Sequence, residues 1–479
     1  MRYAWILFLA AAIASLEGCT VGPKYAKPVV PAPPTDTFKE LDGWKTAQPS
    51  DQAIRGKWWE LFGDPQLNAL EEQVTVSNQD LKIAQARFQE ARAMIRFNRS
   101  AEFPTISTAP GISAIRDSAH RPYFPATHNT GDFVLPFDLS YEVDVWGRVR
   151  RTVSAAREEA QATAGDLQTV NLSLHAELAL DYFELRSADA QKQLLDDTVK
   201  AYADALQLTA NRFDGGAAPK SDVAQAKTQL EAARVQQTDI TVQRAQFEHA
   251  VAVLIGKPPA ALSLQAKPSE FQPPDVSAGL PSQLLERRPD IAAAERRVAE
   301  ANDRIGIARA AFFPTVLLSA TAGFEGDSIT NWFTWPSRFW AVGPSMVETL
   351  FDGGRRRAVS QAARASYDAT VAGYRQTSLT AFQEVEDNLA ALRILSQEAQ
   401  QQRDATASAE ESLQIFTNRY IGGADPYLQV ITAQTAALQN ERNDVDILRR
   451  RMDATVLLIK ALGGGWNVSE LPTMSALGK

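Results

Sequence analysis

Apolar and polar residues alternate strictly over residues 133–145. The odd positions are all apolar and the even positions are nearly all polar or small: Phe133, Leu135, Phe137, Leu139, Tyr141, Val143 and Val145 against Val134, Pro136, Asp138, Ser140, Glu142 and Asp144. A period of two predicts a strand with one apolar and one polar face. The stretch is long for a globular strand but suits a tilted membrane-spanning strand, which needs about 9–11 residues.

The period changes after Gly147, where a long stretch without proline begins. Residues 148–212 are rich in Ala, Glu, Gln and Leu and predict one helix, about 95 Å long at ~1.5 Å per residue. Glycine and proline end it at 215–219, and a second helix is predicted over 221–255. Its apolar residues recur three and four positions apart, with Gln237 and Arg244 as polar interruptions. This spacing predicts antiparallel coiled-coil packing.

The second half of the chain repeats the first. Residues 418–426 lie 207 positions after the similar residues 211–219, and Gly463 follows Gly256 at the same distance. Each half therefore predicts a helix, two membrane-length strands and two long helices in the same order. The expected segments are repeat 1 (67–256, with helices 67–101, 148–212 and 221–255 and a β-hairpin over 105–145), a linker (257–282), repeat 2 (283–463, with helices 283–310, 354–418 and 426–462 and a β-hairpin over 314–351) and a C-terminal tail (464–479).

One chain therefore supplies four membrane-length strands, which cannot close a barrel. Open sheet edges leave backbone groups unsatisfied, and hydrocarbon does not tolerate them. Two chains would give eight strands and a filled barrel, and three would give twelve strands and a lumen. The predicted fold class is an α+β membrane protein whose polar helices continue the barrel into water. Trp332, Trp335 and Trp340, in and beside the loop of the second hairpin, are typical of an aromatic girdle at a membrane interface.

The N-terminus predicts a secretory signal. The mostly apolar run 4–16 is too short to cross a bilayer, which needs about 20 residues, and suits a signal peptide over 1–18. The single cysteine, Cys19, follows a glycine in a pattern that resembles a bacterial lipobox, where it would carry a covalent lipid. Thr20, in place of Asp, implies sorting to the outer membrane; a lone cysteine near an ordinary cleavage site is the alternative. Residues 19–66 would form a lipid-anchored, Pro-rich extended segment.

Composition narrows the function further. The chain has 49 Lys+Arg against 57 Asp+Glu, a net charge of −8, and no basic stripe interleaved with aromatic residues, which argues against nucleic acid as a partner. One cysteine and four histidines without ligand spacing predict no metal site, and no cofactor motif is present. No catalytic constellation emerges, so an enzyme is the least expected class. The alternating strands also argue against a coiled-coil envelope protein without a channel.

Five blocks of the sequence resemble the NodT- or OprM-like lipoprotein branch of the TolC outer-membrane efflux family: Cys19–Pro28, Trp58–Leu67, Tyr141–Arg148, Leu284–Ile291 and Leu350–Arg355. The resemblance covers essentially the whole mature chain. It implies a homotrimer in the outer membrane, with a 12-stranded β-barrel joined to an α-helical periplasmic tunnel. It also implies a passive exit duct for small toxic compounds, docked to a periplasmic adaptor and an inner-membrane pump of the resistance-nodulation-division (RND) type. An exit duct of a type I protein or peptide secretion system is the alternative.

The resemblance also implies that the tunnel closes at its periplasmic tip. In this family acidic side chains and Arg–Asp or Tyr links hold the aperture shut. The candidates here are the acids Asp222 and Asp425, the links Arg419 and Tyr420, and the adaptor-contact turns at Gly215, Gly216, Gly422 and Gly423. Helix capping is the alternative role for both aspartates.

Overall fold

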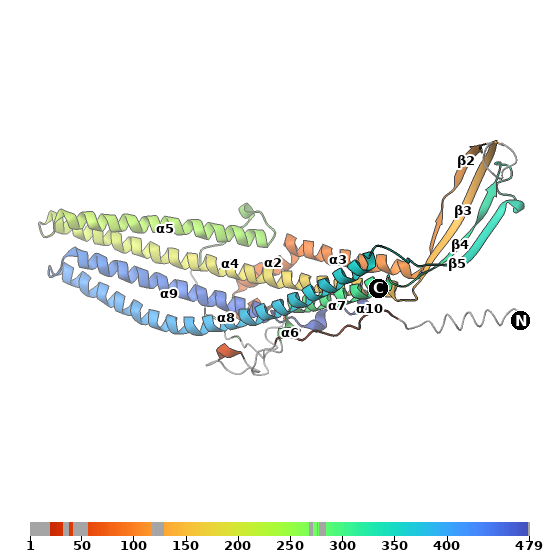
Figure 1. Cartoon of the computed structure of the whole chain (residues 1–479). Helices are drawn as coiled ribbons and strands as arrows, with labels where there is room; N and C mark the ends of the chain where they lie inside the picture. Colours follow the sequence, from red (N-terminus) through yellow and green to blue (C-terminus); the bar gives the residue numbers. More distant parts are fainter. Residues whose placement is uncertain are drawn as a thin grey trace.

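The computed structural model describes residues 20–31, 38–41, 56–116, 118, 129–267, 272–274, 276 and 284–477. The predicted signal peptide and Cys19 lie outside these residues. The molecule is elongated, with a sheet at one end and two long helical hairpins that extend toward the other (Figure 1). The hairpins are α4 (Arg148–Asp214) with α5 (Lys220–Leu254) and α8 (Arg355–Ile421) with α9 (Tyr427–Ala461). In each, a 67-residue helix is followed by a 35-residue helix.

Shorter helices pack beside α4 and α8 on the side of the sheet: α2 (Pro65–Ser77), α3 (Gln79–Arg99), α6 (Leu284–Arg287) and α7 (Pro289–Ala310). The single helix expected over 67–101 is wrong, because the structure breaks it at Asn78. The Asn78 side chain accepts a hydrogen bond from the Leu81 N–H (3.0 Å) and donates one to the Leu254 carbonyl (2.8 Å). Asn78 therefore caps α3 and ties it to the end of α5.

The described strands form one antiparallel sheet in the order β1-β3-β4-β5, with β2 also paired to β3. Their bounds are β1 (Thr105–Thr108), β2 (Gly111–Arg116), β3 (Asn129–Val143), β4 (Thr315–Gly326) and β5 (Arg338–Val347). The strand expected from 105 to 116 is split at Pro110, which has no N–H for the ladder. The last strand, expected to reach 351, ends at Val347 opposite Thr315. Pro314, the next residue on the partner strand, likewise offers no donor.

The coiled-coil packing predicted for the second helix has a clear counterpart in the α4–α5 hairpin. Apolar seam residues such as Leu230 and Ile240 are buried. The two polar interruptions are satisfied by acids of α4: Gln237 donates to Asp196 (2.7 Å) and Arg244 to Asp189 (2.7 Å). Polar seam residues with such partners fix the register of two helices.

The largest apolar cluster lies about midway along the molecule, where α2 and the ends of α5 and α9 meet α4. It includes Trp58, Trp59, Leu67, Tyr182, Phe183, Val251, Ile255 and Ile459. Within the described part of the chain, no helix is both long and apolar enough to cross a bilayer. The apolar cluster described above packs the long helices against one another and against α2.

Both terminal segments lie against the helices near the sheet. Residues 20–31 run along α4 and α7, where Arg151 donates to the Val21 carbonyl (2.8 Å) and Asn302 to the Pro23 carbonyl (3.3 Å). The C-terminal segment is held by a hydrogen bond from Gln161 to the Pro472 carbonyl (2.9 Å). It ends in α10 (Met474–Leu477), whose Leu477 packs between α3 and α4.

Candidate functional site: the apolar sheet and the helical tips

The sheet carries an apolar face that runs from one edge to the other. Cross-strand register aligns the apolar odd positions of β3 with even positions of β4 and β5. The aligned residues are Ile106 and Ile112; Phe133, Leu135, Phe137, Leu139, Tyr141 and Val143; Val316, Leu318, Ala320, Ala322 and Phe324; and Trp340, Val342, Pro344 and Met346. The opposite face holds polar or small residues such as Asp138, Ser140, Ser319 and Thr321.

The apolar face has no cover within the described residues. Trp340 is 76% exposed and Met346 68%. Contiguous exposed apolar surface of this kind marks contact with a membrane or a partner. Both edges of the sheet are also open there, since β5 pairs with β4 alone, and β1 and β2 pair with β3 alone. The exposed apolar face suits contact with lipid, and the open edges leave backbone groups without partners in this sheet.

The three tryptophans of the second hairpin occupy the rim of this face. Trp332 stacks on Phe333 (ring centroids 4.7 Å) and lies against Phe133 (5.7 Å). Arg338 places its guanidinium over the Trp335 ring, and Trp340 stands on the apolar face itself. Aromatic residues with an adjacent cation at a strand end are typical of a membrane–water interface.

The chain passes from β3 into α4 and from β5 into α8 through a glycine with positive φ, Gly147 (79°) and Gly354 (93°) respectively. Acidic residues fix the first turn of each helix. Asp144 accepts from the Val149 and Arg150 backbone N–H groups (3.0 and 2.9 Å), and Asp352 accepts from Arg356. The sheet is therefore joined to the hairpins by hydrogen-bonded corners, which set the direction of the helices relative to the strands.

At the far ends of the hairpins, the two turns have the same geometry. The second glycine of each pair has positive φ, 72° at Gly216 and 76° at Gly423. In each turn the next N–H reaches back to a carbonyl five residues earlier: Ala217 to Arg212 (2.7 Å) and Ala424 to Arg419 (2.9 Å). These are Schellman ends, in which only the glycine at the left-handed position is required by its backbone.

The structure brings two of the predicted gate residues together. Arg419 donates to both carboxylate oxygens of Asp425 (2.6 and 3.0 Å), and this hydrogen bond raises the pKa of Arg419. Neither aspartate caps a helix, because α5 and α9 begin after Pro219 and Pro426 without a side-chain cap hydrogen bond. The alternative role considered for these aspartates is therefore wrong.

Tyr420 lies apart from that ion pair. It is buried, and its ring is 5.1 Å from that of Tyr427. Burial raises the pKa of Tyr427 to about 12, to which the nearby Asp222 also contributes. Among the described residues, Asp222 receives only a weak contact from its neighbour Ser221 (3.5 Å).

A residue that the sequence did not single out joins the two tips. Arg212 at the end of α4 donates to the Ile421 carbonyl of α8 (2.7 Å), and its guanidinium lies 4.8 Å from the centroid of the Tyr420 ring. Arg212 and Arg419 are equivalent in the two repeats, but the position equivalent to Asp425 is Ala218. Arg212 therefore lacks an acid at the position that binds Arg419 in the other turn, and it reaches across to the other hairpin. Alignment of the two repeats in the sequence reveals this difference between Ala218 and Asp425.

Comparison with known proteins agrees with this geometry. A family model described as outer membrane efflux protein matches residues 70–257 and 280–464. The toluene efflux pump outer membrane protein TtgF of Pseudomonas putida is 33% identical over 466 residues, which covers 96% of each protein. The outer membrane protein OprJ of Pseudomonas aeruginosa is 32% identical over 463 residues, covering 95% of this chain and 94% of OprJ.

Solved structures are similar over the same extent. The outer-membrane channel OprN superposes with a TM-score of 0.87 at 28% identity, covering 94% of this chain and all of the OprN chain (100%). The open state of the Neisseria gonorrhoeae MtrE outer membrane channel gives a TM-score of 0.83 at 25% identity, covering 94% and 99%. With its membrane-type sheet, its paired helical hairpins and a family match over both repeats, the chain belongs to the outer membrane efflux protein family.

Proposed function

We propose that three copies of this chain form the outer-membrane exit duct of a tripartite efflux pump for small toxic compounds. The chain is an outer-membrane efflux channel with a large periplasmic part. The sheet supports the trimer, because it has one apolar face and open edges at β1, β2 and β5. If β5 of one copy pairs with β1 and β2 of the next, three copies close a 12-stranded barrel.

Three is the number that leaves room for transport. The split strand β1–β2 counts once, so each copy contributes four strands across the membrane. Two copies would give eight strands, whose interior side chains fill, whereas twelve leave an aqueous lumen. The polar face of the sheet would line this lumen, and the four long helices of each copy would continue it as a tunnel.

The transported compounds and the partners follow from the relatives. TtgF is named as part of a toluene efflux pump, which favours small apolar toxic compounds over exported proteins. We infer a periplasmic adaptor and an inner-membrane RND transporter as partners, with the adaptor on the turns at Gly215–Gly216 and Gly422–Gly423. We also infer a covalent lipid on Cys19, which would add a second attachment to the outer membrane.

The tips of the hairpins would close the duct when no partner is bound. Asp222, Asp425, Arg419 and Tyr420 remain the proposed gate residues, and Arg212 joins them as the link between hairpins. Three copies of Asp425 around an axis would favour cations at the constriction. The Arg419–Asp425 pair, which forms within one turn, moderates that charge.

Assembly and conduction test this proposal together. The full chain, purified from outer membranes in mild detergent, should migrate as a trimer on gels without heating and show the mass of three chains by light scattering. In planar bilayers it should give discrete single-channel steps. In a strain lacking its own outer-membrane channel, co-expression with a cognate adaptor and pump should restore toluene tolerance. A monomer without conductance would refute the duct, and conducting trimers without restored tolerance would refute the assignment of the transported compounds.

A further inference from the structure

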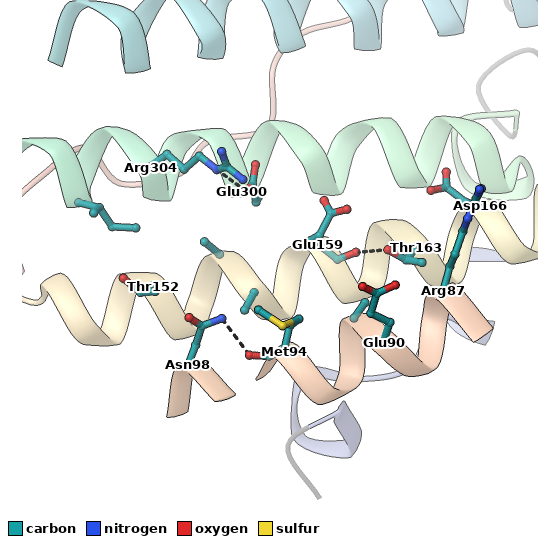
Figure 2. A pocket seen from close by; sticks show the side chains of 14 residues that line it. Arg87, Glu90, Met94, Asn98, Thr152, Glu159, Thr163, Asp166, Glu300 and Arg304 are labelled. Atoms are coloured by element: carbon teal, nitrogen blue, oxygen red, sulfur yellow. Dashed lines mark hydrogen bonds and ion pairs between the residues drawn. The ribbon is translucent and has the colours of Figure 1, made fainter. Parts of the chain in front are cut away.

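A groove lies over α4 between α3 and α7, near the sheet end of the helices (Figure 2). Its volume is about 590 Å³, which is within the range of drug-sized ligand sites. Its floor is apolar and includes Ala91, Met94, Ala155, Ala156 and Ile307. Met94 is 46% exposed there, so the floor offers apolar surface directly to solvent.

Charged side chains form the rim of the groove. Four acids (Glu90, Glu159, Asp166 and Glu300) and two arginines (Arg87 and Arg304) line it. Glu300 pairs with Arg304, one turn away on α7, and Asp166 pairs with Arg297. Figure 2 shows Arg87 pointing toward Asp166. Counting Arg297, the rim carries one more negative than positive charge.

Glu159 and Glu90 are the two acids of the rim that are left after Glu300 and Asp166 are paired. Within the described part of the chain, neither carboxylate has a hydrogen bond or an ion pair, and both point into the groove (Figure 2). The Glu159 side chain reaches solvent, but packing of the surrounding helices partly desolvates its carboxylate and raises its pKa. An unpaired, partly desolvated carboxylate beside an apolar floor is stabilised by a cation that carries an apolar body.

The groove lies on the face of α4 away from both terminal segments. Its α4 residues, among them Thr152, Glu159 and Asp166, repeat at helical spacing on one face. Gln161, which binds the C-terminal segment, is two positions from Glu159 and therefore on the other side of the helix. If the N-terminal segment leads to the lipid anchor proposed on Cys19, it runs outside the tunnel, and the groove on the opposite side then faces the lumen.

We propose that this groove is a resting site for organic monocations with an aromatic or aliphatic body on the inner wall of the duct. The proposal rests on the trimeric duct described above and adds a class of transported compound to it. The surplus carboxylate attracts the cation, and the Met94 floor binds its apolar part. Binding in such a wall site must be weak enough for the compound to leave, as in other conducting pores.

Equilibrium dialysis of tritiated tetraphenylphosphonium against the full-length trimer in nanodiscs tests the site. Glu159→Gln removes the charge and keeps the shape, and should weaken binding about tenfold. Glu177→Gln is the matched control, because Glu177 is an exposed residue of α4, 18 positions and therefore five turns further along the same face. It should leave binding within about twofold of wild type. Met94→Trp, which fills the groove without changing charge, should also weaken binding. It provides a second test if Glu159→Gln does not fold.

Triphenylphosphine oxide is neutral and similar in shape. It should displace little labelled tetraphenylphosphonium from wild type. From Glu159→Gln it should displace the label as well as unlabelled tetraphenylphosphonium does. Equal binding by the two glutamine variants, or wild-type binding no greater than that of empty nanodiscs, would refute the groove as a binding site for organic monocations. If the trimers still conduct in that case, the duct survives. Absence of trimers or of conductance would instead overturn the duct and the groove together.

Discussion

Arg212→Ala should loosen the closed tip of the duct. Arg212 of α4 holds the end of α8 through a hydrogen bond to the Ile421 carbonyl (2.7 Å) and a cation–π contact with Tyr420 (4.8 Å). Both contacts connect one hairpin to the other. If the tips close the duct as proposed, these contacts are lost when the hairpins separate and contribute to the closed state alone.

The magnitude follows from the two contacts. A half-exposed cation–π contact contributes about 1 kcal/mol, and a charged hydrogen bond that solvent partly screens about another 1 kcal/mol. Their loss shifts the equilibrium between closed and open tips by about 2 kcal/mol, roughly 30-fold. A tip that is open about 1% of the time would then be open about a quarter of the time.

Single-channel recording of the purified trimer measures this change as open probability. Arg234→Ala is the control. That arginine pairs with Glu231 within α5, both side chains are about half exposed (51% and 53%), and the pair does not cross between hairpins. An open probability for Arg212→Ala equal to that of Arg234→Ala would refute the role of Arg212 as the link.

Four further predictions test other parts of the molecule. Val342→Arg, on the apolar face, should lower trimer stability in urea by about 2–4 kcal/mol, whereas Ala341→Arg on the opposite face should change it little; equal losses would contradict the assignment of faces. Burial raises the pKa of Asp453 to about 7, so this group destabilises the fold increasingly as pH rises from about 4 to about 7. Asp453→Asn should therefore raise the thermal midpoint at pH 8 and not at pH 4, and an equal gain at both would exclude titration as the cause. Asp425→Asn should lower cation over anion selectivity, seen as a smaller reversal potential in a KCl gradient; an unchanged potential would remove Asp425 from the constriction. Cys19→Ser should abolish labelling by radioactive palmitate while trimers still form, and palmitate in the variant would refute the lipid site.

Much of the architecture was readable from the sequence because it rests on local patterns. The period of two over 133–145 coincides with β3 as far as Val143, where the strand ends, and β3 has one apolar and one polar face. The 207-residue repeat is visible in two hairpins of equal helix lengths. The proposal that several chains assemble also came from the sequence, because four strands cannot satisfy their edge groups in lipid. Family membership, which the sequence blocks indicated, is confirmed.

The tertiary structure decided which residues meet across elements. Asn78 ends a helix because it finds the Leu254 carbonyl, 176 positions away. Arg212 is a link because Ala218 stands where the other turn has Asp425, and because Tyr420 lies within reach. The groove at Glu159 exists because α3 and α7 both pack on α4 and leave part of its surface uncovered. Local sequence sets the period and the ends of an element through backbone sterics and hydrogen bonding, whereas these contacts depend on residues that only the folded chain brings together.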